Sequence, residues 1–195
     1  MAGTKERILT STGELFRRQG YNGTALKQVT ALADAPFGSL YHHFPGGKEE
    51  LAEAVIKSSG QAYQTLFELI EDAAVDPGSA VTDFLDGAAA VLEQTGYVDA
   101  CPIGTVALEG ASTNDRLRQA TAEVFASWVD TAARRLASHG VAPARSIELA
   151  TLLVAAVEGG FMLSRAARSP EPMRASGRLL RELVESELAT VTTTT

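Results

Sequence analysis

The sequence predicts an all-α protein of about nine helices. Apolar residues recur at spacings of three and four through most of the chain, and no segment shows the two-residue period of a strand. Glycine, proline and Asn/Asp residues interrupt this pattern at intervals that suit helices. With 195 residues, 45% of them hydrophobic, the chain can form one large domain, or a small domain joined to a larger one.

The first three helices are expected to be short and closely spaced, over residues 5–19, 25–33 and 36–43. Gly20 stops the first helix, and Thr24 is a good N-cap for the second. Asp34 is expected to end the second helix, because Asp tolerates the left-handed conformation better than most residues. Pro36 fits the first position of the third helix, where its missing N–H would be unpaired anyway.

Longer helices fill most of the rest of the chain. We expect them over residues 47–74, 77–94, 115–138, 143–168 and 172–190, with a short apolar helix from near residue 102. The first of these would be about 40 Å long at 1.5 Å per residue, which is enough to link two domains. The sequence therefore predicts an N-terminal domain of residues 1–46 and a larger helical domain of residues 47–195.

Positive charge is concentrated at the N-terminus. The whole chain carries a net charge of −7, but residues 1–48 hold six Lys/Arg and three Asp/Glu, so the remainder carries −10 by difference. A basic head on an acidic body is typical of a local DNA-binding surface. Chance unevenness of surface charge is the alternative explanation.

Cysteine usage and hydropathy indicate a soluble cytoplasmic protein. Cys101 is the single cysteine, so no intramolecular disulfide can form; we expect it to be a small buried packing residue, with a redox sensor as the alternative. The N-terminus lacks the apolar core of a signal peptide. No apolar run approaches the roughly 20 residues that span a bilayer, since the longest, at 147–163, contains Glu148, Glu158 and two glycines.

Residues 22–51 have the pattern of a helix-turn-helix motif, whose second helix enters the major groove of DNA while the first crosses the backbone. Leu40 and Phe44 would anchor the second helix to the domain, and the polar side chains beside them suit phosphate oxygens. Lys48 lies at the start of the next helix, where free N–H groups also attract anions. The candidate DNA contacts are Thr24, Lys27, Pro36, Phe37, Gly38, Ser39, Tyr41, His42, His43 and Lys48.

The segment FGSLYHHF at 37–44, followed by KEEL at 48–51, resembles the TetR family of transcriptional repressors. The resemblance covers residues 5–55 closely. The turn PGGKEEL and the segment ACPIGTVALE at 100–109 are similar to the LmrA/YxaF-like branch of that family. Asp34, Pro36 and Phe37 depart from the usual family pattern, which leaves base preference open. Phe37 would either pack on a thymine methyl group or be buried with Leu40, Tyr41 and Phe44.

The resemblance implies a ligand pocket and a dimer interface in the larger domain. The pocket candidates, each also a plausible core residue, are Tyr63, Phe67, Phe84, Leu108, Phe125, Trp128, Glu158, Phe161 and Met162. Glu158 would need a partner or a cationic ligand unless it lies at the surface. The last two long helices have wide apolar coverage, which favours a four-helix dimer contact over an unusually wide core. The dimer candidates are Leu149, Leu152, Leu153, Ala156, Gly160, Leu163, Leu179, Leu180, Leu183 and Val184.

The function that the sequence favours is a ligand-responsive transcriptional repressor. By resemblance, a homodimer binds a palindromic operator and is released when a small hydrophobic effector binds. A helical protein-interaction module without DNA binding is one alternative, and a small-molecule enzyme is another. We expect no catalytic residues, metal or cofactor, because the sequence has no G-x-S-x-G motif, no Cys/His metal spacing and no Gly-rich phosphate loop after a strand.

Overall fold

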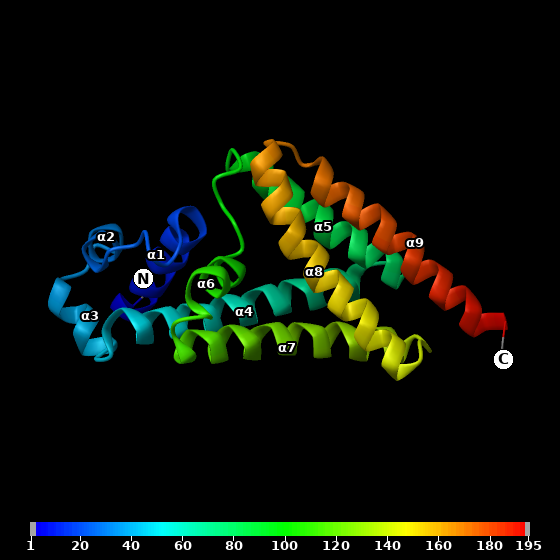
Figure 1. The fold of residues 1–195 in the computed structure, drawn as a ribbon, viewed down its shortest axis with the longest axis horizontal. Coiled ribbons are helices and arrows are strands. Elements are labelled where there is room, and N and C mark those ends of the chain that lie inside the picture. The colour runs from blue at the N-terminus through cyan, green and yellow to red at the C-terminus, as the bar shows by residue number, and fades with distance from the viewer. Residues whose placement is uncertain (1–2, 194–195) are drawn as a thin grey trace. The chain divides into compact units, whose positions relative to one another are not determined.

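The computed structural model describes residues 3–193, and within them it contains nine α-helices and no strand (Figure 1). The prediction of an all-α fold is confirmed. The observed bounds differ from the predicted ones by a few residues at most. The helices are α1 Thr4–Gln19, α2 Leu26–Leu32, α3 Phe37–His43, α4 Gly47–Ala73, α5 Pro77–Gln94, α6 Pro102–Gly110, α7 Asp115–Ser138, α8 Pro143–Ala167 and α9 Glu171–Thr193.

Side chains that precede the helices explain several of these starts. Asp76 caps α5, because its Oδ1 accepts a hydrogen bond from the Ser79 N–H at 2.8 Å.

Two predicted starts are wrong in detail. Ala25, not Thr24, is the N-cap of α2, and its N–H donates to the side chain of Gln28 at 2.9 Å. Pro36 is the N-cap of α3 and not its first residue.

Packing divides the chain into two compact units. Unit 1 comprises the chain up to Ala62 together with Asp99–Val124, and unit 2 comprises Tyr63–Val98 together with the chain from Phe125 onward. Helices α4 and α7 contribute residues to both units. The predicted domain boundary after residue 46 falls inside unit 1, so the packing units and the predicted functional domains divide the chain differently.

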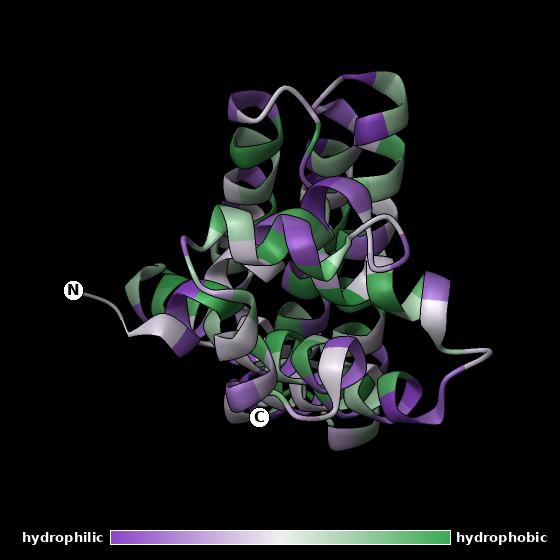
Figure 2. Ribbon diagram, turned by 90° about the vertical axis from the view of Figure 1, so that its left-hand side faces the viewer, coloured by the Kyte–Doolittle hydropathy of each residue, from purple (hydrophilic) through white to green (hydrophobic). Residues whose placement is uncertain are grey.

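The core of unit 1 joins α1, α2 and α3 to the first part of α4, to α6 and to the start of α7. Hydrophobic and hydrophilic residues are interspersed along the helices, as the 3.6-residue period of amphipathic helices requires (Figure 2). Helix α1 packs against α2, α3 and α6. The fully buried side chains of this core include Ile8, Phe16, Val29, Leu40, Leu51, Ile103 and Leu117.

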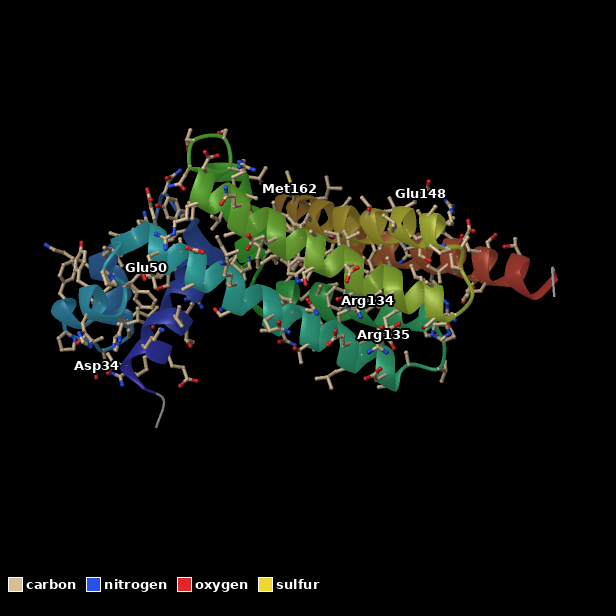
Figure 3. The ribbon with its side chains drawn as sticks, turned by 90° about the horizontal axis from the view of Figure 1, so that it is seen from below. Asp34, Glu50, Arg134, Arg135, Glu148 and Met162 are labelled. Atoms are coloured by element: carbon tan, nitrogen blue, oxygen red, sulfur yellow. The ribbon has the colours of Figure 1, made fainter. Side chains whose placement is uncertain are left out.

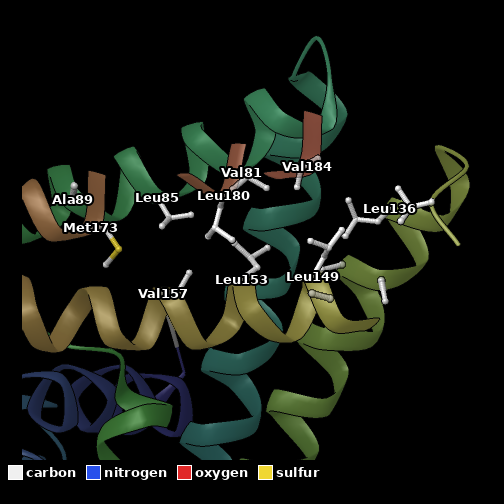
Figure 4. Packing of buried hydrophobic residues seen from close by; sticks show 14 of the residues in the cluster. Val81, Leu85, Ala89, Leu136, Leu149, Leu153, Val157, Met173, Leu180 and Val184 are labelled. Carbon is white, nitrogen blue, oxygen red and sulfur yellow. The ribbon is translucent and has the colours of Figure 1, made fainter. Parts of the chain in front are cut away.

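The core of unit 2 is built mainly from α5, α8 and α9, which pack against one another. Figure 4 shows the leucine and valine side chains of these helices, with Met173 among them, pointing into a shared interior. The buried face of α8 follows the helical period and consists of Ser146, Leu149, Ala150, Leu153, Val157, Gly160 and Ser164. This face leaves other apolar residues of the same helix at the surface, among them Leu152, Met162 and Leu163.

Helix α8 is long and apolar enough, by length and composition alone, to cross a membrane. Its mean hydropathy of 1.6 over 18 residues corrects the expectation that two glutamates and two glycines exclude such a segment. About 33% of that window is buried within the protein. Core helices of soluble proteins pass the same test, and α8 supplies part of the core of unit 2.

Two helical glycines of unit 2, Gly160 and Gly87, test how closely its core is packed. A Cβ at Gly160 would lie 2.5 Å from Sδ of Met173, which is fully buried. Gly160→Ala should therefore lower the free energy of unfolding, because overpacking costs about 1–3 kcal/mol and the helix gains at most about 1 kcal/mol.

Gly87→Ala is the matched control. Apart from its chain neighbours and the backbone of its own helix, no described atom lies within 4 Å of a Cβ at Gly87 in α5, so the same substitution should raise the free energy of unfolding by about 0.5–1 kcal/mol. Urea unfolding measures both changes. Equal stabilisation by the two substitutions would contradict the close packing of α8 on Met173.

Candidate nucleic-acid interface

Helix α3 is held by its inner face. It has only seven residues, so packing and not helix propensity must fix it. Leu40 and Phe44 supply that packing, with exposed fractions of 0% and 2%. The backbone takes a positive φ on both sides of α3, at Asp34 (φ 46°) before the helix and at Gly47 (φ 67°) after it. The short helix is therefore clamped at both ends and along one side.

Arg7 of α1 stabilises the turn between α2 and α3. Its Nε donates to the Ala33 carbonyl and its Nη2 donates to the Asp34 carbonyl, each at 2.9 Å. These bonds support a left-handed backbone at a residue that is not glycine (Asp34 is labelled in Figure 3). Sequence reasoning missed Arg7, because its partners lie 26 and 27 residues away and no local spacing indicates them.

The outward face of α3 carries an exposed aromatic pair. Phe37 is 44% exposed and Tyr41 46%, and their ring centroids are 5.6 Å apart in an edge-to-face arrangement. The alternative in which Phe37 is buried with Leu40 and Phe44 is therefore wrong. Gly38, which follows Phe37 on α3, is exposed and has open space where a Cβ would stand among the described atoms.

Five other predicted DNA contacts lie on or beside the helix-turn-helix elements. Lys27, Pro36 and His42 are exposed, and Ser39 and His43 are half-buried. The three polar side chains on α3 can offer hydrogen-bond donors to phosphate oxygens. The structure thus brings these five predicted residues onto α2, α3 and the turn that joins them.

Thr24 does not belong to this surface. It is 2% exposed, and its hydroxyl donates to the Gly20 carbonyl at 2.7 Å. That carbonyl lies just after the end of α1, where backbone acceptors lose their helical partners. Thr24 therefore stabilises the turn between α1 and α2, and the expectation that it reaches DNA is corrected.

Lys48 is the second residue of α4 and lies over an aromatic ring. Its Nζ is 4.4 Å from the centroid of the Tyr21 ring, which is the range of a cation–π contact. Burial lowers the pKa of Lys48, and the nearby Glu109 carboxylate opposes this shift. Tyr21 also packs edge-to-face on the buried Phe16, with centroids 5.8 Å apart.

The net charge of residues 1–48 overstates the positive charge that faces outward. Arg17 and Arg18 both form ion pairs with Asp99, at 3.2 Å and 3.4 Å. Arg18 also pairs with Glu14 at 2.6 Å. Asp99 lies outside the N-terminal segment, so the sequence count could not include it.

The predicted pocket residues separate into groups. Two aromatic clusters form in unit 2: Trp128 meets Tyr63 and Phe125 at centroid distances of 6.2 Å and 5.6 Å, and Phe67 meets Phe84 at 5.4 Å. Glu158 and Phe161 are half-buried. Leu108 and Met162 are not pocket residues in this structure, because they are 73% and 59% exposed. Sequence periodicity alone could not show which side of each helix faces outward.

A small cavity lies in unit 2, with a volume of about 20 Å³. Phe67 is the one predicted pocket residue that reaches it. Its lining is apolar except for Glu71, and consists of Phe67, Glu71, Pro77, Ala80, Val81, Ala132, Leu136, Leu149, Leu153, Leu180 and Val184.

Glu71 is the functional candidate that sequence reasoning missed in this unit. Its side chain is 8% exposed, and its Oε2 lies 3.2 Å from Nε of Arg135 without a well-aligned hydrogen bond. Arg135 also forms an ion pair with Asp72, whose Oδ1 lies 2.8 Å from Nη1 of Arg135. Burial raises the pKa of Glu71, and Arg135 partly opposes this. A carboxylate that lines an apolar cavity is suited to a hydrogen-bond donor or a cation.

The predicted dimer residues also separate into two groups. Leu149, Leu153, Gly160, Leu180 and Val184 are buried in the core of unit 2, so they are corrected to core residues, and Ala156 and Leu183 pack against that core. Three others remain available at the surface: Leu152 at 46%, Leu163 at 61% and Leu179 at 65% exposure. Met162 is also exposed on α8, the helix that carries Leu152 and Leu163 (Figure 3).

Cys101 is buried at the N-cap of α6, where its Sγ accepts from the Gly104 N–H at 3.4 Å. This placement is that of a packing and capping residue.

Comparisons with known proteins agree with this geometry. Residues 8–55 match the family model of the bacterial regulatory proteins of the tetR family. Residues 77–179 match the C-terminal domain of LmrA/YxaF-like transcriptional regulators. The chain is 36% identical over 170 residues to the HTH-type transcriptional regulator YxaF of Bacillus subtilis, covering 87% of this chain and 89% of that one. It is 35% identical over 171 residues to LmrA of the same organism, covering 87% and 90%.

The fold has solved counterparts as well. A TetR transcriptional regulator from Legionella pneumophila superposes with a TM-score of 0.80, covers 95% of this chain and 97% of its own, and is 23% identical. These relatives are transcriptional regulators and not enzymes. The two family models together span the exposed α3 and most of the helices beyond it. The chain therefore belongs to the TetR family of helix-turn-helix transcriptional regulators, with an LmrA/YxaF-like C-terminal domain.

Proposed function

We propose that this regulator is a cytoplasmic repressor that binds a palindromic operator as a homodimer. We further propose that a small hydrophobic effector binds in unit 2 and releases the protein from DNA. The observation that carries the DNA-binding part is the exposed surface of α3, with the aromatic pair Phe37 and Tyr41 and the open Gly38. Monomeric proteins seldom expose aromatic rings side by side without a partner for them.

This face suits the major groove in shape and chemistry. Gly38 lets the backbone of α3 approach the bases closely, and Phe37 can pack on a thymine methyl group. Tyr41, His42, His43 and Lys48 supply donors to phosphates, which fix the position of the helix without reading sequence. Lys27 of α2 is exposed and free to approach the backbone or a base edge.

The homodimer is supported by the apolar residues that unit 2 leaves exposed on α8 and α9. Leu152, Met162, Leu163 and Leu179 are all between 46% and 65% exposed. A two-fold contact through these helices would bury them against their own copies. The two copies of α3 would then need to lie roughly 34–36 Å apart to enter successive major grooves.

Effector release requires two conformations with different affinity for DNA. A cavity of about 20 Å³ holds no more than a water-sized group, so the helices that line it must move apart to admit an effector. Glu71 would then offer a polar anchor in an otherwise apolar lining. Helix α4 carries Glu71 in unit 2 and Lys48 in unit 1, so it connects the two functions along one continuous backbone.

A salt series tests the DNA contacts. Lys48→Ala should weaken binding to every duplex and reduce the slope of log K against log salt by about one, because one phosphate contact is lost. Phe37→Ala should change which sequence is preferred. Fluorescence anisotropy with DNA from upstream of the protein's own gene measures both.

Lys57→Ala is the control for Lys48→Ala, since Lys57 lies on the same helix and pairs with Glu53 at 2.8 Å. It should leave affinity and slope unchanged. If wild type binds no duplex at low salt, the proposed function is wrong; if Lys48→Ala binds as wild type does, the assigned phosphate contact is wrong.

The dimer is tested by placing a charge on its proposed surface. Leu163→Glu should convert the wild-type dimer into a monomer, because it would bury an unpaired carboxylate against its symmetry copy. Sedimentation velocity reports the mass. Val75→Glu is the control, because Val75 is 91% exposed on the turn between α4 and α5. A wild-type monomer, or a Leu163→Glu variant that remains a dimer, would contradict the proposed interface.

The buried carboxylate has a pH signature. The pKa of Glu71 is raised in the folded state, so the protonated group stabilises the fold at low pH. The wild type loses this stabilisation as pH rises from the pKa of the unfolded chain towards the higher pKa of the folded protein. Glu71→Gln removes that titration. The stability of Glu71→Gln relative to wild type should therefore increase from pH 4 to pH 7 in urea unfolding. A relative stability that falls over the same range would show that Glu71 is stabilised as a carboxylate.

A further inference from the structure

Helix α6 reaches the turn between α1 and α2 through one side chain. Oε2 of Glu109 accepts a hydrogen bond from the Asn22 N–H at 2.6 Å. Gly20 has φ 77°, and a Cβ at this residue would overlap the Glu109 carboxylate. A glycine at position 20 therefore permits both the turn and the close approach of the carboxylate to its backbone.

A second set of contacts with α1 lies at the other end of the 99–110 segment. The Asp99 side chain, 12% exposed, accepts from Arg17 and Arg18 of α1. The Ala100 N–H donates to the Arg17 carbonyl at 3.1 Å. The stretch 99–110 is thus fastened to the end of α1 and to the turn that follows, at two places ten residues apart.

The turn held by Glu109 contains the aromatic ring on which Lys48 rests. Tyr21 precedes Asn22, and its ring contacts Phe16 of the core and Nζ of Lys48. Glu109 also acts on Lys48 directly, because its charge favours the protonated amine against the effect of burial. A path of contacts therefore runs from Glu109 through the Asn22 amide and the Tyr21 ring to Lys48.

We propose that Glu109 is a positioning residue for DNA binding, which holds the Tyr21–Asn22 turn so that Lys48 is placed to bind a phosphate. The inference rests on the proposed function, in which Lys48 is a phosphate contact. The physical reason is preorganisation: a turn and a long side chain that are already ordered lose less entropy when DNA binds. Glu109 itself carries a negative charge, so its benefit must come through position and not through attraction to DNA.

Two substitutions separate position from charge. Glu109→Ala removes both the acceptor for the Asn22 N–H and the negative charge, and should weaken DNA binding about five- to tenfold. Glu109→Gln retains an acceptor and removes only the charge, so its affinity should stay within about twofold of wild type. Asp115→Asn is the control for loss of one negative charge. Asp115 is an exposed acid of unit 1, and it forms an ion pair with Arg118 one helical turn away.

A double-mutant cycle tests whether Glu109 acts through Lys48. In a Lys48→Ala background, Glu109→Ala should have little further effect on the affinity for the upstream duplex, because the side chain that it positions is gone. Additive losses would overturn the inference, and so would equal losses in Glu109→Ala and Glu109→Gln. A general loss of structure is checked by urea unfolding of each variant.

If Glu109→Ala does not fold, Tyr21→Ala supplies the second route. It removes the ring and leaves the Glu109 hydrogen bond, and it should lower the salt slope as Lys48→Ala does. An unchanged slope in Tyr21→Ala would contradict the path through the ring. No duplex binding by wild type contradicts the proposed function, whereas tight wild-type binding with additive losses contradicts the inference alone.

Discussion

The burial of Leu40 and Phe44 is the constraint on which the DNA-binding surface depends. A helix of seven residues spans only about 10 Å and has little stability of its own, so its orientation is set by the two side chains that it buries. Phe37 and Tyr41 stay at the surface of the same helix, 44% and 46% exposed. The turns at Asp34 and Gly47 then define where the helix begins and ends, and Arg7 secures the first of them.

The surface is not the product of residues 1–46 alone. Leu51 and Val55 of α4 are buried in the core of unit 1, and the 99–110 segment holds the end of α1 and the following turn through Asp99 and Glu109. The chain passes from unit 2 to unit 1 between Val98 and Asp99, immediately before the first of these ties. These contacts from distant segments order the helices around α3, as binding in a DNA groove requires. Helix α4 connects them to unit 2, where we propose that the effector binds.

Local sequence signals were enough to predict the helices, including the second helix of the helix-turn-helix motif. Glycine, proline and Asn/Asp breaks marked the helix ends, and the spacing of Leu40 and Phe44 indicated the inner face of α3. What escaped prediction depends on distant partners: the burial of Thr24 against Gly20 and the cavity position of Glu71. On α8, the neighbours Leu152 and Leu153 look equally apolar in sequence, yet one is 46% exposed and the other 7%, because the packing of α5 and α9 selects the buried side.

Amide hydrogen exchange with and without a duplex from upstream of the protein's own gene tests the central claim most directly. The account predicts that DNA slows exchange in two places: the turn of residues 20–23 and the stretch from Pro36 to Lys48. The α8 and α9 amides of an existing dimer should be unaffected. Slowed exchange confined to α8 and α9, with none in α3, would show that this surface does not bind the groove and would contradict the account.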